Sequence, residues 1–279
     1  MLDRELQNEI IRKNRNFTKG YQDNDPYGET FESDQELKLP QPPLVKEPMS
    51  ADGNLIKLTR DFSGIPIKND TVGLIRERKS TRVYTQESMN LDQLSFLLWA
   101  TQGVKALRGK AYATLRTVPC GGARHEFETY LLVRNIEGLE NGAYHYLPME
   151  HGLEFLGPIG DLEETITRSL SGQSWAAKAN VVFYWSMVPY RAEWRYGIYA
   201  HRTALIDVGH VGQNLYHACT ALGLGCCAIA AFEHEICSEI FGLDGEEEYI
   251  VYTVPVGTVR DCDKESEQAF YKFVEEQNL

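Results

Sequence analysis

A basic run at residues 76–82 is the first stretch whose residue types could do chemistry. Its sequence is Arg-Glu-Arg-Lys-Ser-Thr-Arg, which puts four basic side chains in seven positions with a serine and a threonine between them. Arginine binds a phosphate through two parallel hydrogen bonds, and hydroxyl groups add further donors. The run therefore predicts an anion site built from Arg78, Lys79, Ser80 and Arg82; the competing interpretation is a solvated basic surface.

Two stretches rich in small residues are candidates for contact with a flat ring. In the loop at 119–122 a proline is followed by a cysteine and two glycines, so the backbone can approach a ligand closely. The stretch at 223–231 combines glycines with small side chains and leaves similar room. An ordinary turn and a packed central strand are the competing interpretations. The residues assigned to this contact are Pro119, Cys120, Gly121, Gly122, Cys227, Ala228 and Ile229.

The segment at 193–202 is dense in aromatic and proton-active groups and precedes the longest predicted helix. Tyr196 or His201 could act there as a general acid or base, although a packed aromatic loop would have the same composition. Farther along the chain, Gly257 ends a short turn and Arg260 follows it. Arg260 could reach a phosphate, or it could be a lone surface arginine.

The composition of the chain excludes several functional classes. Its 279 residues carry a formal net charge of −12, which repels a nucleic-acid backbone, so we expect no nucleic-acid partner. Glycine patterns of the Rossmann and P-loop kinds are absent from the sequence. The six cysteines include no Cys-x-x-Cys pair and no zinc spacing, so we expect buried free thiols and no metal site. With no apolar run near ~20 residues and no signal-peptide core, we expect a cytoplasmic protein without a membrane partner.

The elements that must position these residues follow the pattern of an α+β fold. Asn90 followed by Gln93 predicts a capped helix that ends at Gly103, and Asp161 with Glu164 predicts a second helix start. We expect a mixed or antiparallel central sheet flanked by helices. Apolar runs predict strands at 128–134, 143–149, 153–156, 181–188, 226–232 and 249–257. Apolar spacing predicts further helices at 201–222, at 234–242 and around 270–274.

The predicted helix at 201–222 has a long apolar stripe, with two glycines that flatten its surface at 209 and 212 so that another helix could approach. The stripe comprises Leu205, Val208, Val211, Leu215, Ala218, Cys219 and Leu222. Residues 1–55 are polar and end in prolines, which predicts an arm or linker ahead of a domain at 56–279. Apolar residues between 10 and 21 indicate that part of this arm docks on a surface.

Taken in this order, the motifs resemble the nitroreductase-like flavoprotein superfamily, and more narrowly the SagB/ThcOx-type dehydrogenases, from about residue 70 onward. The segment 78–82 matches a basic-Ser-x-basic motif of these proteins. The segment 119–128 is similar to their Pro-Ser-x-Gly-x-x-x-Pro-x-Glu loop, with Cys120 in place of serine and Glu126 in place of proline. The helix at 201–222 resembles the one that builds their dimer core, and Gln213 lies in its pattern.

The resemblance implies a dimeric nitroreductase-like fold that binds FMN at the interface of two subunits and transfers hydride through the flavin N5. It assigns the motif at 78–82 to the FMN phosphate and pyrimidine side, and the loop at 119–122 to the ring. Gln213, the segment 227–229, Gly257 and Arg260 complete the implied FMN contacts.

Azoline-oxidising relatives use a Lys-Tyr pair before this helix, and the resemblance places Arg195 and Tyr196 at those positions. A guanidinium does not give up its proton near neutral pH, so Arg195 cannot act as a general base. It could instead bind an anionic substrate or the phosphate of a hydride donor. The second substrate stays open between an azoline-like ring in a peptide and a nitro, quinone or enone compound reduced with NAD(P)H. A non-redox FMN-binding subunit of a peptide-modifying complex and a thiol enzyme are the remaining alternatives.

Overall fold

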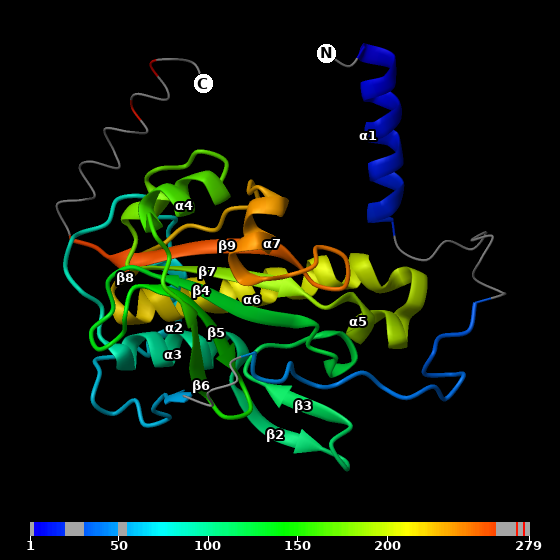
Figure 1. Cartoon of the computed structure of the whole chain (residues 1–279), viewed down its shortest axis with the longest axis horizontal. Coiled ribbons are helices and arrows are strands. Elements are labelled where there is room, and N and C mark those ends of the chain that lie inside the picture. The colour runs from blue at the N-terminus through cyan, green and yellow to red at the C-terminus, as the bar shows by residue number, and fades with distance from the viewer. Residues whose placement is uncertain (1–2, 20–30, 50–54, 261–271, 273–275, 277–279) are drawn as a thin grey trace.

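The computed structural model describes residues 3–19, 31–49, 55–260, 272 and 276. Its centre is a seven-stranded sheet in the order β1-β6-β5-β4-β7-β9-β8, in which every neighbouring pair is antiparallel (Figure 1). A separate hairpin pairs β2 with β3. The strands are β1 Leu55–Lys57, β2 Val104–Arg108, β3 Ala113–Arg116, β4 Phe127–Val133, β5 Gly142–Leu147, β6 Gly152–Gly157, β7 Val181–Met187, β8 Leu224–Cys226 and β9 Tyr249–Thr258.

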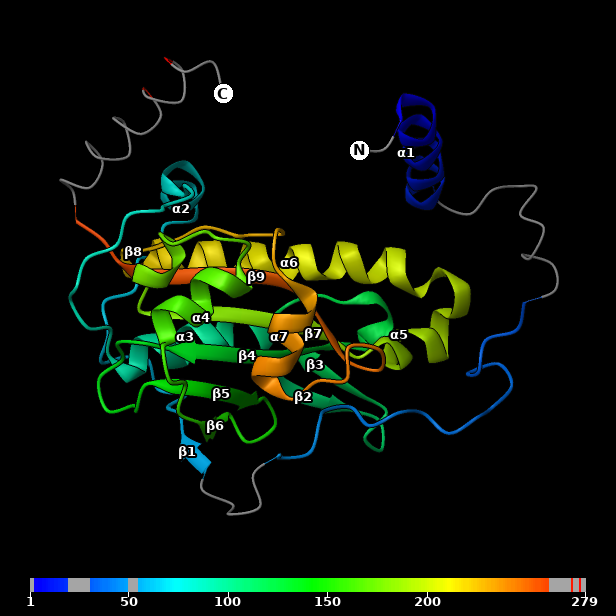
Figure 2. The same ribbon diagram turned by 45° about the horizontal axis from the view of Figure 1, so that its top comes forward.

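Helices cover both faces of this sheet, with α3 and α6 on one face and α4 and α7 on the other (Figure 2). Side chains alternate between the two faces of a strand, so a strand covered on both sides is apolar throughout. In β7, Phe183 packs with the first layer and Tyr184 with the second. The helices are α1 Arg4–Thr18, α2 Thr71–Glu77, α3 Leu91–Gln102, α4 Leu162–Ser169, α5 Pro189–Tyr196, α6 Ala200–Leu222 and α7 His234–Phe241.

The α+β fold with an antiparallel sheet flanked by helices is confirmed. At the start of α3, Asn90 Oδ1 accepts the Gln93 N–H at 2.8 Å and Gln93 Oε1 accepts the Asn90 N–H at 3.1 Å. The helix ends at Gly103 as predicted. The cap of α4 also forms, since Asp161 accepts the Glu164 N–H. The capping residues in the sequence therefore predict the helix ends correctly.

Two of the predicted elements are wrong in detail. The strand predicted at 226–232 is reduced to β8 and an isolated bridge at Ile229. Between them the Cys227 N–H donates to the Pro255 carbonyl, but Pro255 has no N–H to donate in return, which interrupts the ladder. Leu205, predicted in the buried stripe of α6, is 54% exposed. Gly212 lies on the buried side of α6, where a Cβ would meet the Tyr252 ring. The helix predicted around 270–274 lies outside the described residues.

Residues 31–49 run across the body of the domain. The Gln35 N–H donates to the Trp194 carbonyl at 2.8 Å, and the Met49 N–H donates to the Glu154 carboxylate. By contrast, α1 has no buried residue; Arg202 Nε donates to the carbonyl of Thr18 at its end. The division of the chain at residue 55 stays a prediction. Among the described helices, none combines the length and the apolarity that crossing a membrane requires.

Candidate functional site

The run at 78–82 meets the segment 226–228 at Tyr216 on α6. The Arg78 guanidinium lies 5.3 Å from the centre of the Tyr216 ring, and Ser80 Oγ is 2.9 Å from the Tyr216 hydroxyl. The Ala228 N–H donates to the same hydroxyl at 2.9 Å. Two motifs that are about 150 residues apart therefore share one side chain. We call this group, with Arg82 and Cys227, the basic cluster.

Arg82 and Cys227 belong to the same neighbourhood. The Arg82 guanidinium lies 5.8 Å from the centre of a Trp175 ring. Burial raises the pKa of the Cys227 thiol, while the positive charge of Arg82 and a hydrogen bond from Ser80 oppose that rise. Burial also raises the pKa of Tyr216. The cluster thus combines cations, a hydroxyl and a neutral phenol, which is a donor set suited to a phosphate.

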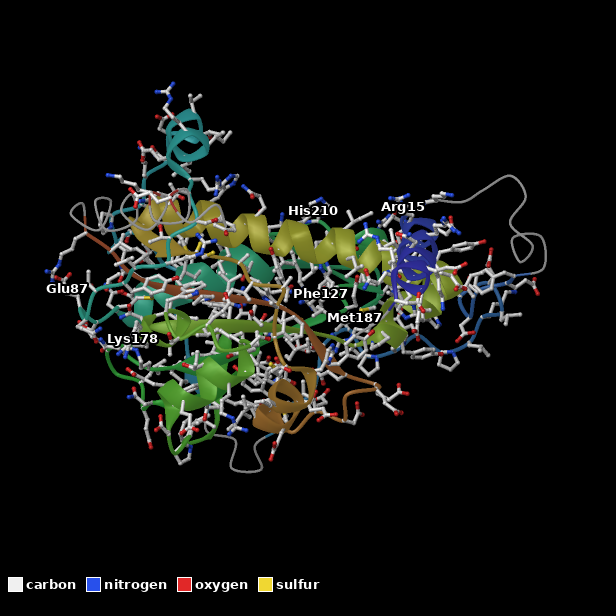
Figure 3. The ribbon with its side chains drawn as sticks, turned by 90° about the horizontal axis from the view of Figure 1, so that it is seen from above. Arg15, Glu87, Phe127, Lys178, Met187 and His210 are labelled. Atoms are coloured by element: carbon white, nitrogen blue, oxygen red, sulfur yellow. The ribbon has the colours of Figure 1, made fainter. Side chains whose placement is uncertain are left out.

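Gly257 and Arg260 lie outside the basic cluster's hydrogen bonds. Gly257 pairs with Gly225 in the sheet, where a Cβ on Gly257 would meet the Tyr84 ring at 2.8 Å. Arg260 forms an ion pair with Glu87, both of them exposed. Figure 3 shows Glu87 near one end of the molecule and Phe127, the neighbour of Glu126, near its middle. Arg260 is therefore bound at the edge of the fold rather than beside the loop at 119–126.

The loop at 119–122 packs against α5 and the start of α6. The Gly121 N–H donates to Asp207 Oδ2 on α6 at 2.7 Å. Gly122 has a φ of +56°, and a Cβ there would lie 2.5 Å from Arg195 Cδ and 2.8 Å from the Tyr196 hydroxyl. Only glycine combines this backbone conformation with so close a neighbour. The structure therefore brings the predicted loop together with both predicted catalytic residues.

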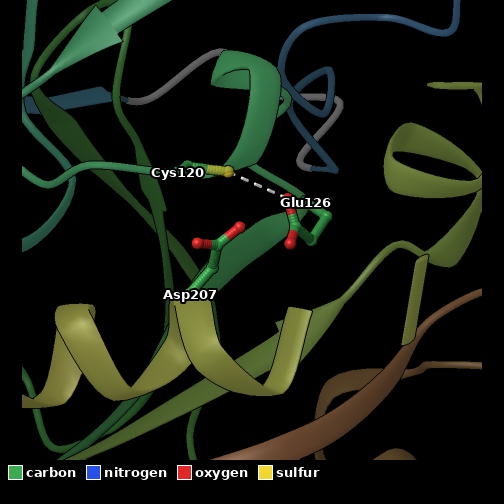
Figure 4. A group of neighbouring side chains, drawn as sticks. All are labelled: Cys120, Glu126 and Asp207. Carbon is green, nitrogen blue, oxygen red and sulfur yellow. Dashed lines mark hydrogen bonds between the residues drawn. The ribbon is translucent and has the colours of Figure 1, made fainter. Parts of the chain in front are cut away.

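Cys120, Glu126 and Asp207 point toward one another behind this loop (Figure 4). The Cys120 thiol donates to Glu126 Oε2 at 3.1 Å, and Glu126 Oε1 is buried without a hydrogen-bond partner among the described residues. Burial raises the pKa of the Glu126 carboxyl to about 7 and raises that of the Cys120 thiol far above its usual range. Both shifts favour the protonated form of each group in this buried setting. We call these three residues the thiol–carboxyl cluster.

Arg195 lies at the wall of an open cavity of about 630 Å³. Its Nη1 donates to Gln35 Oε1 at 3.0 Å and to the Tyr112 hydroxyl at 3.1 Å. Its Nε is buried and has no hydrogen-bond partner in the part of the chain that the structure describes. Arg108 and Cys120 line the same cavity. Tyr196 lies beside Arg195, with its ring centre 5.6 Å from the guanidinium.

The two groups lie at different points along α6. Tyr216 and Asp207 are nine residues apart, so a rise of 1.5 Å per residue separates them by ~14 Å along the helix axis. Gln213 lies between them on the exposed side, and its Nε2 donates to His217 Nε2 at 2.8 Å. His201 pairs with Glu193 at the exposed start of the helix. Within one chain, the predicted site residues therefore form two groups, and Gln213, Gly257 and Arg260 lie outside both.

Sequence reasoning missed several residues of these groups. Tyr216 was overlooked because a tyrosine at a partly buried helix position has no local signal of its own. Asp207 falls on the apolar stripe of α6 and interrupts it, which is the one signal that was available. Gln35 and Tyr112 reach Arg195 from the segment 31–49 and from the β2–β3 hairpin, and no spacing in the sequence links those segments.

Known proteins are similar to this chain in sequence and in fold. A sequence model of the nitroreductase family matches residues 75–258. The nitroreductase-type protein MJ1384 of Methanocaldococcus jannaschii is 33% identical over 185 residues, which span 65% of this chain and 87% of that protein. The microcin B17-processing protein McbC of Escherichia coli is 28% identical over 136 residues; the match spans 46% of this chain and 49% of McbC.

A solved structure shares the fold. The crystal structure of a nitroreductase-type protein from Ralstonia eutropha superimposes with a TM-score of 0.60 at 22% identity, over 80% of this chain and all of that chain. At this identity, the likeness concerns the fold alone.

Proposed function

Because the chain belongs to the nitroreductase family, we propose that it is an FMN-dependent oxidoreductase that works as a homodimer. The observation that carries the proposal is the meeting of Arg78 and Ser80 with Tyr216 and Ala228. In a chain with a net charge of −12, basic side chains gathered beside hydroxyl groups form a local positive patch that suits an anion. The phosphate of FMN is the anion that the family membership supplies.

The residues present fit FMN in their chemistry. Arg78, Lys79 and Arg82 would hold the phosphate through charge-assisted hydrogen bonds, with Ser80 as a further donor. The loop at 119–122 would lie along the ring, since Gly122 leaves no side chain between the backbone and a ligand. When bound, FMN supplies the hydride chemistry, and the protein supplies orientation and electrostatics.

A homodimer is supported by an apolar surface that one chain leaves open. Val72 and Ile75 on α2 are 63% and 62% exposed, and Leu205 and Ile206 on α6 are 54% and 50% exposed. Figure 3 shows His210 on α6, where it is also exposed. The two pairs lie near opposite ends of α6, because Leu74 of α2 lines the same pocket as Ala218 and Ala221. Exposed apolar side chains of this size are typical of a protein interface. A second copy would also bring its loop at 119–122 toward the basic cluster of the first, which would explain why the two groups are ~14 Å apart in one chain.

Arg195 bears on whether the enzyme oxidises or reduces its second substrate. Oxidation of an azoline ring needs a base that removes a proton, and a guanidinium does not accept that role. Tyr196, which lies beside Arg195, is then the predicted proton donor or acceptor. Reduction with NAD(P)H needs no such base, and the cationic Arg195 favours it as the second candidate function. The name of McbC connects that relative with peptide processing, which keeps a peptide substrate in the proposal.

An absorbance spectrum of the purified protein, followed by anaerobic addition of NADH or NADPH, tests the proposal. We expect a flavin spectrum and its rapid bleaching by one of the two nucleotides. Flavin that is bound but stays oxidised with both nucleotides would shift the proposal to the dehydrogenase direction or to a non-redox subunit. A colourless protein that does not take up added FMN would refute it.

A further inference from the structure

The cavity beside Arg195 is lined by two arginines, Arg108 and Arg195, and, among the described residues, by no carboxylate. Neither arginine forms an ion pair with another described residue; Arg195 donates to the neutral Gln35 and Tyr112, and its guanidinium lies 5.6 Å from the centre of the Tyr196 ring. In a chain that carries 40 acidic and 28 basic residues, an acid-free cavity with two arginines is unexpected.

A third guanidinium increases this imbalance. Arg124 is 3% exposed, and it donates to the carbonyls of Gly122 and Tyr112. Its guanidinium lies 4.8 Å from the centre of the Tyr112 ring. Burial lowers the pKa of Arg124, and the positive charge of Arg195 lowers it further. The two arginines therefore repel each other across Gly122, and a bound anion would relieve that repulsion.

The hydrogen bonds around Tyr112 and Arg195 also point to a hydrogen-bond acceptor in this cavity. The Tyr112 hydroxyl accepts one hydrogen bond from Gln35 Nε2 at 2.7 Å and a second from Arg195 Nη1 at 3.1 Å. With both lone pairs occupied, this hydroxyl has its own hydrogen left to donate. Arg195 Nε also has a hydrogen without an acceptor among the described residues. Two donors beside the same cavity thus lack acceptors, and buried donors without acceptors are rare in folded proteins.

We propose that this cavity binds an acidic group of the second substrate, a carboxylate or a phosphate, through Arg195, Arg108 and the Tyr112 hydroxyl. Gln35 is the positioning residue, because it bonds both Arg195 and Tyr112 and holds them in one orientation. A cavity of about 630 Å³ has the size of a small-molecule site. The inference names the substrate class of the proposed oxidoreductase and so rests on that function for its biological meaning.

Binding of benzoate and of its neutral isostere benzamide to the FMN-saturated protein, at constant ionic strength, tests the proposal by calorimetry. We expect benzoate to bind at least ~10-fold more tightly, because it forms charge-assisted hydrogen bonds and benzamide does not. Arg195→Gln should abolish the preference and Tyr112→Phe should reduce it. Arg168→Gln, which removes an exposed charge on α4 at the opposite face of the sheet, should leave it unchanged.

Equal affinities for benzoate and benzamide in the wild-type protein, or a preference that survives Arg195→Gln, would overturn the proposal. Arg195→Lys, which keeps the charge, covers the case in which the glutamine variant does not fold; it should retain part of the preference. Inorganic pyrophosphate distinguishes the two sources of the anion. Displacement of benzoate would support the phosphate of a dinucleotide, and lack of displacement would support a substrate carboxylate.

The flavin spectrum recorded on the same samples separates this proposal from the proposed function. If the protein holds no flavin but still prefers benzoate to benzamide, the anion-site proposal stands and the FMN proposal is wrong. If the protein holds flavin but shows no preference, the FMN proposal stands and the anion-site proposal is wrong.

Discussion

The two groups of residues on α6 are built in different ways. The basic cluster takes its cations from one continuous run, 78–82, and its other members from Tyr216 and the turn at 226–228. The groups around Asp207 and Arg195 draw on the segment 31–49, the β2–β3 hairpin, the loop at 119–126, α5 and α6. A phosphate site needs charge at one place, and a short run provides it. A reaction site needs proton-active groups with distinct environments, and only tertiary packing provides those.

The largest expected effect tests the basic cluster. Arg78→Ala combined with Arg82→Ala should weaken FMN binding at least ~100-fold, because two charge-assisted hydrogen bonds of ~1.5–3 kcal/mol each are lost. Equilibrium dialysis with flavin fluorescence measures the change. Arg76→Ala removes a charge from the exposed last turn of α2 and serves as the control. If the double variant binds FMN as the wild-type protein does, the phosphate lies elsewhere.

The difference between a continuous run and tertiary packing also explains which features of the site can be predicted from the sequence. The run at 78–82 and the capping pair Asn90–Gln93 are local, so their chemistry is visible without a fold. The contact between Cys120 and Glu126 is also short-range, but their pKa shifts depend on burial by elements that spacing does not predict. Leu205 was assigned to the wrong side because an apolar period on a helix does not distinguish the chain's own core from a surface left for a partner.

The next effect concerns Glu126, whose pKa of about 7 in the folded protein exceeds the ordinary value of 4.5 because of burial. Between these values the folded chain keeps a proton that the unfolded chain releases. The free energy of unfolding should therefore fall as pH rises from 4.5 to 7, with ~3 kcal/mol as the upper limit of the loss. Glu126→Gln stays neutral and should remove this pH dependence.

Urea denaturation of the wild-type protein and of Glu126→Gln at pH 5 and pH 8 measures this pH dependence of the free energy of unfolding. Other titrating groups contribute to both curves, so the difference between the two proteins is the quantity of interest. Glu150→Gln, at an exposed glutamate, is the control and should follow the wild-type curve. Parallel curves for the wild-type protein and Glu126→Gln would show that Glu126 is ionised in the fold and that the thiol–carboxyl cluster is not a protonated pair.

A smaller effect tests how tightly the loop at 119–122 is held against α5. Gly122→Ala combines an unfavourable φ of +56° with a clash against Arg195 and Tyr196, so it should lower the free energy of unfolding by ~2–3 kcal/mol. Gly138→Ala has a φ of +81° and no atom within 4 Å of the new Cβ, so strain alone should lower it by ~1 kcal/mol. Equal losses in the two variants would mean that Arg195 and Tyr196 move aside freely, and the second group would then be less preorganised than the basic cluster.

The smallest effect returns to Tyr216, where the two motifs of the basic cluster meet. Tyr216→Phe keeps the ring under Arg78 but removes the hydroxyl that contacts Ser80 and accepts the Ala228 N–H. One net hydrogen bond of ~1 kcal/mol should be lost, which corresponds to ~5-fold weaker FMN binding in the dialysis experiment. Tyr252→Phe is the matched control, since the Tyr252 hydroxyl makes no hydrogen bond within the described ranges. If both variants bind FMN equally well, the hydroxyl of Tyr216 shapes the turn at 226–228 without tuning the phosphate site, and the cations alone determine affinity.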